Sequence, residues 1–417
     1  MLRIVLLAWK NIWRNKVRSM VILSAIAIGL FSGTFMIAFL QGWIFGTVND
    51  DIETQYSHIQ IHDTDFLANY DIKAFFYREA VEDKINRFFE GTTYHRDAMH
   101  GKDTKAFVPT TSFRLNITGM LASSHNAMGV TAKGVLEDEE RKVTDVWKYI
   151  PDSLGVFLTD DTRNAMVISR KMADKLKVRL RSRIVFTFQD IHGDMQSIAF
   201  RVCGIYKTTN GMFDETHVFV RYNDIFDYTG LPEGAYHEAA IRLPDIETCS
   251  ILTPQLKTLF ADMDVQDWGD MNPALSMYFA YTDFMGVIIL GIFLFALSFG
   301  IINTMLMAVL ERTRELGMLG AIGMSKRKIF SMIMLETVFL TLFGGMVGII
   351  LGIVFILPTL ETGIDLSFFM QDQFEDFGFS SMVYPVLNMK MLIQIVVLVI
   401  LTGILSAIYP ARKAIIF

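Results

Sequence analysis

Four long apolar segments constrain the fold of this chain more than any other feature of its sequence. Residues 19–49, 284–310 and 391–411 contain no charged side chain over 31, 27 and 21 residues, and residues 329–360 contain only Glu336. Because a helix of roughly 20 residues crosses a bilayer, each segment is long enough to span a membrane. The chain is therefore predicted to be an integral membrane protein, and its net charge of −6 argues against a nucleic-acid-binding function.

The first 19 residues predict a helix that lies in the membrane interface. They carry five cations and two tryptophans, and apolar residues recur at helical spacing along one arc. A charged leader of a signal peptide is the alternative, but the apolar region of a signal peptide covers only about 7–15 residues. The 31 uncharged residues that follow therefore favour a retained first transmembrane helix, with the N-terminus in the cytoplasm.

The segment 311–328, between the second and third spans, is predicted to lie in the cytoplasm. It carries five cations, which the positive-inside rule places on the cytoplasmic side. Its centre, residues 316–323, is apolar and contains three glycines. A short helix of this kind suits docking into a groove of a cytoplasmic partner, although a plain basic turn between two spans would carry the same charge.

Residues 47–277 form a long polar stretch between the first and second spans, and the topology places it outside the cytoplasm. Alternating or β-branched runs at 58–62, 183–188, 198–206 and 216–221 predict strands, whereas 73–90 and 167–178 predict helices. The stretch is long enough for an α/β domain with its own core, and for a division into two lobes.

The predicted fold is therefore four transmembrane α-helices, with a large α/β extracytoplasmic domain between the first and second and a cytoplasmic coupling helix between the second and third. In chain order the predicted boundaries are 1–19 for the amphipathic interface helix, 20–46 for the first span, 47–277 for the outside domain, 278–310 for the second span, 311–328 for the coupling helix, 329–358 for the third span, 359–389 for an outside loop, 390–411 for the fourth span and 412–417 for a cytoplasmic tail.

The stretch ERTRELGMLGAIGMSKRKI, residues 311–329, resembles the cytoplasmic coupling element of the FtsX-like (type VII) ABC transporter permeases. This family includes the MacB efflux pump and the Lol lipoprotein-releasing permeases. Residues 41–63, 130–146 and 165–188 are similar to segments of the family's periplasmic MacB-like domain, and YPARKA at 409–414 is similar to its C-terminal signature. In the third of these segments the family often has a glycine where this chain has Arg181 or Ser182. Together the matches favour the Lol-type branch, LolC and LolE.

The resemblance implies a permease subunit in the bacterial inner membrane, with both termini in the cytoplasm, that transmits ATP-driven motion to its periplasmic domain. The implied partners are two ABC ATPase subunits, a second permease copy or paralogue, and a periplasmic lipoprotein chaperone or lipoprotein cargo. Release of lipoproteins from the inner membrane is the favoured function, with MacB-like efflux or FtsX-like signalling to a periplasmic partner as alternatives. The sequence contains no GxxxxGK[ST] loop, so the chain is expected not to be an enzyme and to hold no cofactor, with ATP and Mg in the partner ATPase.

Three sets of residues are candidates for function. Small residues at every fourth position let helices approach closely, which favours packing over a hinge for Gly29, Gly33, Gly344, Gly348 and Gly352. A lone carboxylate within a span is costly unless it is paired, so Glu336 is expected to form an anchoring salt bridge rather than a proton relay. By the resemblance, the residues that couple to the ATPase are Glu311, Arg312, Arg314, Glu315, Leu316, Gly317, Leu319, Ile322 and Gly323.

The outside domain offers little evidence for catalysis. His58 and His62 lie four residues apart on a predicted strand without a nearby carboxylate pair, which argues against a zinc site. The run Ser123-Ser124-His125 has no assignable acid partner, which argues against a catalytic triad and a membrane enzyme. Cys203 and Cys249 are both expected outside the cytoplasm, where they could form a disulfide or remain two thiols.

Overall fold

The computed structural model describes residues 2–14, 16–91, 94–96, 105–158, 163–366 and 381–415. The chain divides into two compact units. The first consists of Met1–Ile44, Ala280–Ile364 and Val383–Phe417, and the second of Phe45–Phe279 and Asp365–Met382.

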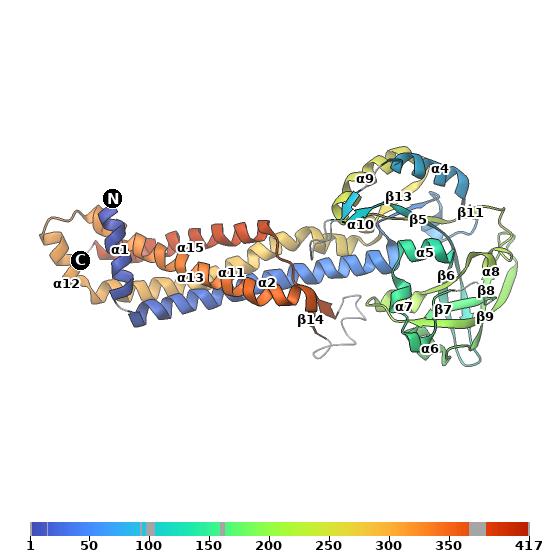
Figure 1. Cartoon of the computed structure of the whole chain (residues 1–417), viewed down its shortest axis with the longest axis horizontal. Helices are drawn as coiled ribbons and strands as arrows, with labels where there is room; N and C mark the ends of the chain where they lie inside the picture. The colour runs from blue at the N-terminus through green and yellow to red at the C-terminus, as the bar shows by residue number, and fades with distance from the viewer. Residues whose placement is uncertain are drawn as a thin grey trace. The chain divides into compact units, whose positions relative to one another are not determined.

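The first unit is helical. Its helices are α1 (Leu2–Arg14), α2 (Lys16–Asp51), α11 (Pro273–Glu311), α12 (Thr313–Ala321), α13 (Lys326–Thr362) and α15 (Met389–Ala414), and α2 and α11 continue into the second unit. Within the described residues, four of these helices are long and apolar enough to cross a membrane: α2, α11, α13 and α15. Figure 1 shows these four side by side, with α1, α12 and both chain ends at one end of the unit.

The long helices extend beyond the predicted spans. The sequence predicts the first span at 20–46, but α2 begins at Lys16 and ends at Asp51. Polar residues at a helix end can continue the same backbone hydrogen bonds, so the helix need not end where the apolar run ends. The predicted coupling helix 311–328 is shorter in the structure, because the backbone turns at Gly323 and α13 already begins at Lys326.

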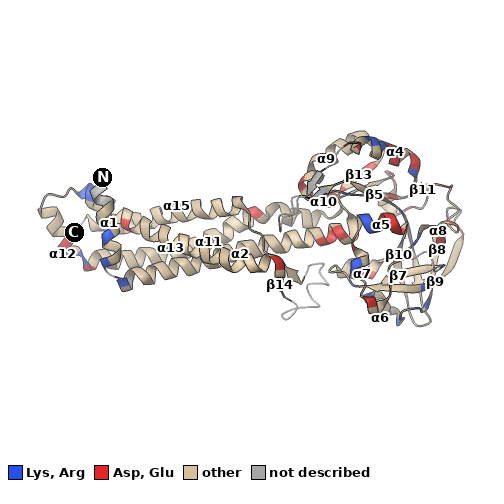
Figure 2. Ribbon diagram, in the orientation of Figure 1, with Lys and Arg blue, Asp and Glu red and all other residues tan. Residues whose placement is uncertain are grey.

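Charged residues are unevenly distributed along the helical unit. Figure 2 shows Lys and Arg gathered at the end of the helical unit that carries α1 and α12, while the ribbons of the helices between are almost free of charge. At that end α1 packs on α13 through two edge-to-face aromatic pairs. The ring centroids of Trp9 and Phe339 are 6.1 Å apart, and those of Trp13 and Phe343 are 6.2 Å apart. Ile12, on the same apolar side of α1, is buried.

The second unit is an α/β domain. Its strands are β1 (Ile59–His62), β2 (Phe76–Tyr77), β3 (Tyr94–Arg96), β4 (Lys105–Phe107), β5 (Thr110–Ala122), β6 (Ala127–Val135), β7 (Ala165–Ser169), β8 (Arg183–Gln189), β9 (Met195–Tyr206), β10 (His217–Arg221), β11 (Ala235–Tyr236), β12 (Glu238–Arg242) and β13 (Asp264–Asp267); β14 (Ile364–Asp365) and β15 (Met382–Val383) follow later in the chain. Its helices are α3 (Phe66–Asn69), α4 (Arg78–Phe89), α5 (Glu137–Val143), α6 (Arg170–Leu176), α7 (Gly211–Thr216), α8 (Tyr222–Phe226), α9 (Ile246–Leu259) and α10 (Trp268–Met271), with a π-helical turn η1 (Ile52–Tyr56) and 3-10 turns at Val146–Tyr149 and Asp152–Leu154.

One large sheet organises this domain. Its strand order is β13-β1-β12-β5-β6-β10-β7-β9-β8, and β5 also pairs with β8. The first residues of the long strand β5 pair with β12, and its last residues pair with β8. The second pairing closes the strands β5-β6-β10-β7-β9-β8 into a ring. At the closing contact a Cβ on Gly119 would lie 2.5 Å from the carbonyl oxygen of Thr187, so a residue without a side chain is needed there.

The predicted strands at 58–62, 183–188, 198–206 and 216–221 correspond to β1, β8, β9 and β10. The predicted helices at 73–90 and 167–178 are correct only in part, because each begins with a strand, β2 and β7 respectively. Both strands are short apolar runs directly before a helix, where a helical pattern extends easily over the preceding residues. Arg181 has φ of +67°, a left-handed backbone conformation that glycine adopts most readily. The turn therefore has this conformation although the residue is an arginine.

Candidate functional site

A chain of ion pairs joins α1, α12 and α13. Arg312 lies between α11 and α12, and its Nη1 is 3.2 Å from Oε1 of Glu336 on α13, while its Nε is 3.2 Å from Oε2 of Glu315 on α12. Glu315 also pairs with Arg14 of α1 at 2.5 Å, and the hydrogen bond from Arg14 lowers the pKa of Glu315. The chain Arg14–Glu315–Arg312–Glu336 therefore links three helices.

Glu336 lies deep in the helical unit. Its side chain is 4% exposed and that of Arg312 is 15% exposed. An ionised carboxylate in an apolar helix is costly without a partner, and the two hydrogen bonds from Arg312, at 3.2 and 3.5 Å, offset that cost. The partner, Arg312, comes from the connection between α11 and α12.

The two faces of α12 differ in exposure. Leu316 is 7% exposed and belongs to the apolar core of the helical unit, with Leu319 packed partly against it. Away from this core, Met318 is 57% exposed, and Ile322, the residue directly after α12, is 78% exposed. Met318 is not among the predicted coupling residues, because the resemblance alone does not tell which apolar positions of the helix are buried.

Gly317 and Gly323, on either side of the end of α12, differ in what the structure requires of them. Gly323 has φ of +101°, and its N–H donates to the carbonyl of Gly320 while the next N–H, of Met324, donates to Leu319. This left-handed glycine ends α12, so it is needed for the backbone. Gly317 has no atom within 4 Å of an added Cβ and is exposed, as are Glu311 and Arg314. A small residue at Gly317 is therefore not required by the chain itself.

The glycines predicted to pack helices lie at helix contacts. A Cβ on Gly348 of α13 would lie 2.6 Å from the carbonyl oxygen of Ala27 on α2, and the same helix meets α2 at Gly344 and Gly352. On α2, a Cβ on Gly29 would meet Leu297 of α11 at 2.6 Å, and one on Gly33 would meet Leu290 at 3.1 Å. The two glycine sets thus lie on two contacts that α2 makes within the unit.

A buried cluster of charges lies on the sheet of the α/β domain, where no sequence motif marks it. Arg114 on β5 is completely buried; its Nε and Nη2 donate to Glu140 at 2.9 Å each, and its Nη1 donates to Glu238. Burial alone would raise the pKa of Glu140, but the charge and hydrogen bonds of Arg114 lower it below its ordinary value. The only sequence signal is the alternation along β5, where apolar residues alternate with Arg114 and Asn116.

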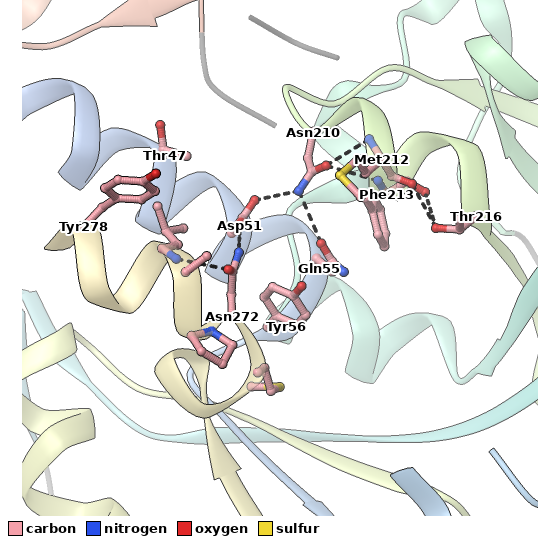
Figure 3. A pocket seen from close by; sticks show the side chains of 14 residues that line it. Thr47, Asp51, Gln55, Tyr56, Asn210, Met212, Phe213, Thr216, Asn272 and Tyr278 are labelled. Atoms are coloured by element: carbon pink, nitrogen blue, oxygen red, sulfur yellow. Dashed lines mark hydrogen bonds between the residues drawn. The ribbon is translucent and has the colours of Figure 1, made fainter. Parts of the chain in front are cut away.

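A cavity of about 530 Å³ lies beside the end of α2 in the same domain (Figure 3). Figure 3 shows the side chains of Asn210 and Asn272 directed toward Asp51, to which their amides donate at 2.9 and 3.3 Å. Asn210 precedes α7 and accepts hydrogen bonds from the N–H groups of Met212 and Phe213. Asn272 precedes α11 and accepts one from the N–H of Leu275. Asp51 therefore ties the end of α2 to the starts of both helices.

The histidines and cysteines of the domain have structural surroundings. His58 Nδ1 accepts from the N–H of Leu243, and His62 contacts the carbonyl of His237 and the side chain of Gln60. In the described part of the chain, no group of three or more His, Cys, Asp or Glu residues could hold a metal ion. Cys203 and Cys249 are both free thiols, and Ser124 and His125 lie in an exposed turn between β5 and β6.

The C-terminal part of the chain matches a known family. The model described as FtsX-like permease C-terminal covers residues 287–416. An uncharacterized ABC transporter permease of Methanocaldococcus jannaschii is 28% identical over 268 residues, which are 62% of this chain and 62% of that protein. The uncharacterized ABC transporter permease YknZ of Bacillus subtilis is 44% identical over 64 residues, 15% of this chain and 16% of that protein. The macrolide export ATP-binding/permease protein MacB of Chlorobium luteolum is 34% identical over 121 residues, 28% of this chain and 15% of that protein.

The chain thus spans less than two thirds of the length of these relatives. Two solved structures also align with it. The extracellular domain of the noncanonic ABC-type transporter YknZ from Gram-positive bacteria aligns over 50% of this chain and 99% of that one, with 14% identity and a TM-score of 0.32. The periplasmic region of MacB from Actinobacillus actinomycetemcomitans aligns over 55% and 98%, with 11% identity and a TM-score of 0.34. The family match covers most of α11 and all of α12, α13 and α15, so the similarity to FtsX-like permeases lies in these four helices.

Proposed function

We propose that this chain is the permease subunit of an ABC transporter, driven by ATP hydrolysis in a separate ATPase subunit. The observation that carries the proposal is the geometry of α12. Leu316 and the Arg312–Glu336 pair hold this helix to its own unit, while Met318 and Ile322 are exposed. An apolar surface on an anchored helix, with small residues beside it, suits docking by a partner protein. The names of the relatives, ABC transporter permeases and ATP-binding/permease proteins, support an ATPase as that partner.

The ion pairs among Arg14, Glu315, Arg312 and Glu336 transmit motion of α12 to the neighbouring helices. ATP binding brings two ATPase subunits together, and each pushes on the α12 that it holds. Because Glu315 and Arg312 bind both α1 and α13, displacement of α12 moves these helices with it. The chain enters the outside domain from α2 and leaves it into α11, so movement of the spans is passed to the domain through these two connections.

The working unit is proposed to be a dimer. Four spans enclose little space, so a second copy or a paralogous permease completes the assembly, together with two ATPase subunits. In this assembly ATP and Mg²⁺ bind to the ATPase. The chain itself contributes the docking helix, the spans and the outside domain.

Two cargo classes have support from different observations. Release of lipoproteins from the inner membrane is supported by the resemblance of residues 41–63, 130–146 and 165–188 to Lol-type permeases. MacB-like efflux of a small substrate is supported by relatives whose names describe macrolide export. In both, the outside domain rearranges when α12 is pushed, and only the molecule that is handled differs.

Spheroplasts of the source organism test the proposal and separate the two cargo classes. With the chain depleted, labelled lipoproteins should stay in the membrane when soluble lipoprotein chaperone is added, whereas control spheroplasts release them. Normal release together with increased macrolide sensitivity of depleted cells would favour efflux. Unchanged lipoprotein release and unchanged sensitivity would leave signalling to a periplasmic partner, and would contradict a transport function.

A further inference from the structure

The cavity beside Asp51 has the size and the walls of a small-molecule site. Its volume of about 530 Å³ lies within the usual range for ligand pockets, roughly 300–1,000 Å³. Its lining mixes aromatic and apolar side chains with a few polar groups, which come from the end of α2, from η1, from α7 and from the first turns of α11. All of these residues belong to the α/β unit, so one compact part of the chain forms the cavity.

Asp51 is the only charged residue among the described residues that line this cavity. It is 4% exposed, so its carboxylate is almost entirely withdrawn from water. No Lys, Arg or His stands beside it in the described part of the lining. Burying an ionised carboxylate without a counter-charge is costly. The wall of the cavity therefore holds a negative charge that no residue of the described wall balances.

Two neutral amides, rather than a cation, hold the carboxylate of Asp51. Asn210 donates to its Oδ1 at 2.9 Å, and Asn272 donates to its Oδ2 at 3.3 Å. The orientation of both amides is fixed, because the side-chain oxygen of each accepts a backbone N–H near the start of the helix that follows. A carboxylate has about four acceptor sites, so these two hydrogen bonds leave roughly half of them for a ligand.

Lys133 does not supply the missing positive charge. Its Nζ contacts the carbonyl oxygen of Gln55, a residue of the cavity wall, at 3.3 Å. Lys133 itself lines a different cavity together with Glu238, and Glu238 is its main charge partner. The charge of Lys133 is therefore already engaged by another carboxylate.

Aromatic and methionine side chains make up much of the rest of the wall. Figure 3 shows Tyr56 and Tyr278 on either side of Asp51, and Phe213 lines the same cavity. The face of an aromatic ring attracts a cation, and methionine adapts its shape to an apolar group. A buried carboxylate beside such rings suits a positively charged group that carries an apolar body.

We propose that this cavity binds an organic cation, a protonated amine on an apolar body, with its ammonium group on the carboxylate of Asp51 and its body against Tyr56 and Tyr278. The headgroup of a zwitterionic lipid fits less well, because its phosphate has no cation among the described residues of the wall. The site does not depend on the coupling function proposed for α12. Asp51 lies on α2 and Asn272 directly precedes α11, so a ligand here contacts the two helices that continue into the helical unit.

Binding is tested by calorimetric titration of the purified full-length chain in a neutral detergent at neutral pH. The probes are 2-phenylethylamine, its uncharged analogue 2-phenylethanol, the anion 3-phenylpropanoate, and glycerophosphoethanolamine. The amine should bind, and the alcohol and the anion should bind roughly tenfold to hundredfold more weakly, because neither places an ammonium group on Asp51. Tighter binding of glycerophosphoethanolamine than of the amine would identify a lipid headgroup as the occupant and would overturn the proposal.

The variant Asp51→Asn removes the charge at nearly constant shape. Asp138→Asn, at an exposed position of α5, is the matched control. Asp51→Asn should lose the preference for the amine over the alcohol, and the control should keep it. The melting temperature of each variant without ligand establishes folding. Retained preference for the amine in folded Asp51→Asn would overturn the proposal.

A second pair of variants leaves the hydrogen bonds of Asp51 in place. Met212 lines the cavity and is 69% exposed, so Met212→Lys adds a tethered ammonium group that competes with the ligand. Met195→Lys, at a position of β9 that is 68% exposed, is its control. Amine binding should weaken at least tenfold in the first variant only, a comparison that holds even if Asp51→Asn fails to fold. No binding of the amine at millimolar concentration, equal binding of the alcohol, or equal binding by both lysine variants would overturn the proposal.

Discussion

Arg312 and Glu336 are separated by 24 residues in the chain, and the guanidinium Nη1 of Arg312 lies 3.2 Å from Oε1 of Glu336. This contact fixes the start of α12 to the first half of α13. Arg312 also binds Glu315 of α12, and Glu315 binds Arg14 of α1, so Arg312 joins α12 to α13. Separate predictions follow from this contact for the stability of the chain and for its coupling to the proposed ATPase.

Glu336→Gln should destabilise the chain. The change leaves Arg312 largely buried without a full counter-charge, at a cost of about 3 kcal/mol. Arg312→Met combined with Glu336→Met removes both charges and should recover most of the lost stability, measured as the thermal unfolding midpoint in detergent. An anchoring pair predicts that the double variant also keeps transport. A stable double variant without transport would instead assign Glu336 to a proton relay.

Gly317→Leu should uncouple the chain while leaving it folded. An added side chain at Gly317 meets no atom of the chain within 4 Å, so its only expected effect is on a partner that docks there. The measurement is ATP hydrolysis by the partner ATPase in the reconstituted complex, which the Gly317 variant should no longer stimulate. Gly300→Leu on α11 is the matched control, because it is equally open. Full stimulation by the Gly317 variant would remove the docking role from this face of α12.

Gly323→Leu should behave differently from Gly317→Leu. With φ at +101°, the backbone at Gly323 is strained for any residue with a side chain, at a cost of about 1–2 kcal/mol. This variant should therefore lower both the unfolding midpoint and the coupling. A Gly323 variant as stable as the unaltered chain would show that the turn after α12 relaxes easily.

A graded series of alanine substitutions tests the packing glycines. Gly348→Ala should cost about 1–3 kcal/mol, because the new Cβ would lie 2.6 Å from the backbone oxygen of Ala27, which cannot move alone. Gly29→Ala should cost less, since its nearest atom is the end of the flexible Leu297 side chain. Gly291→Ala meets nothing within 4 Å and should be neutral or slightly stabilising. Equal unfolding midpoints for all three would argue against close packing of α2 and α13.

The α/β domain should lose stability in acid through Glu140. The folded state lowers the pKa of this carboxyl below its ordinary 4.5, so ionised Glu140 stabilises the fold above that pH. The contribution is lost as the pH falls through the lowered pKa. Glu140→Gln should therefore destabilise the chain by about 3–5 kcal/mol at pH 7 and flatten the decline in stability below pH 4.5. The measurement is the unfolding midpoint across pH, with Glu233→Gln at an exposed position as the control. The same dependence of the midpoint on pH in both variants would refute a stabilising role for ionised Glu140.

The four long apolar helices could be predicted from the sequence because their signals are local. Uncharged runs mark the membrane helices, and the cations and glycines of residues 311–328 mark the connection between two of them. The need of Glu336 for a cation follows from its place in an apolar run. Which cation serves it depends on the packing of α12 on α13, and local pattern carries no information about that.

The α/β domain is less predictable because its features depend on the register of its strands. The ion pairs of Arg114 require that β12 lies beside β5 with Glu238 opposite Arg114, and these residues are far apart in the sequence. The same holds for the pairing that sets Asn116 opposite Lys133. Short strands before helices, such as β2 and β7, are easily predicted as helix. A run of a few apolar residues fits both the helical repeat and the alternation of a strand.

Docking of an ATPase on α12 is tested by affinity purification of the tagged chain from membranes in mild detergent, followed by mass spectrometry. The Gly317→Leu and Gly300→Leu variants are purified in parallel. An ABC ATPase should co-purify with the unaltered chain and with the Gly300 variant, and should be strongly depleted with the Gly317 variant. Absence of an ATPase from the unaltered chain, or equal recovery with all three, would contradict a permease that docks its ATPase through α12.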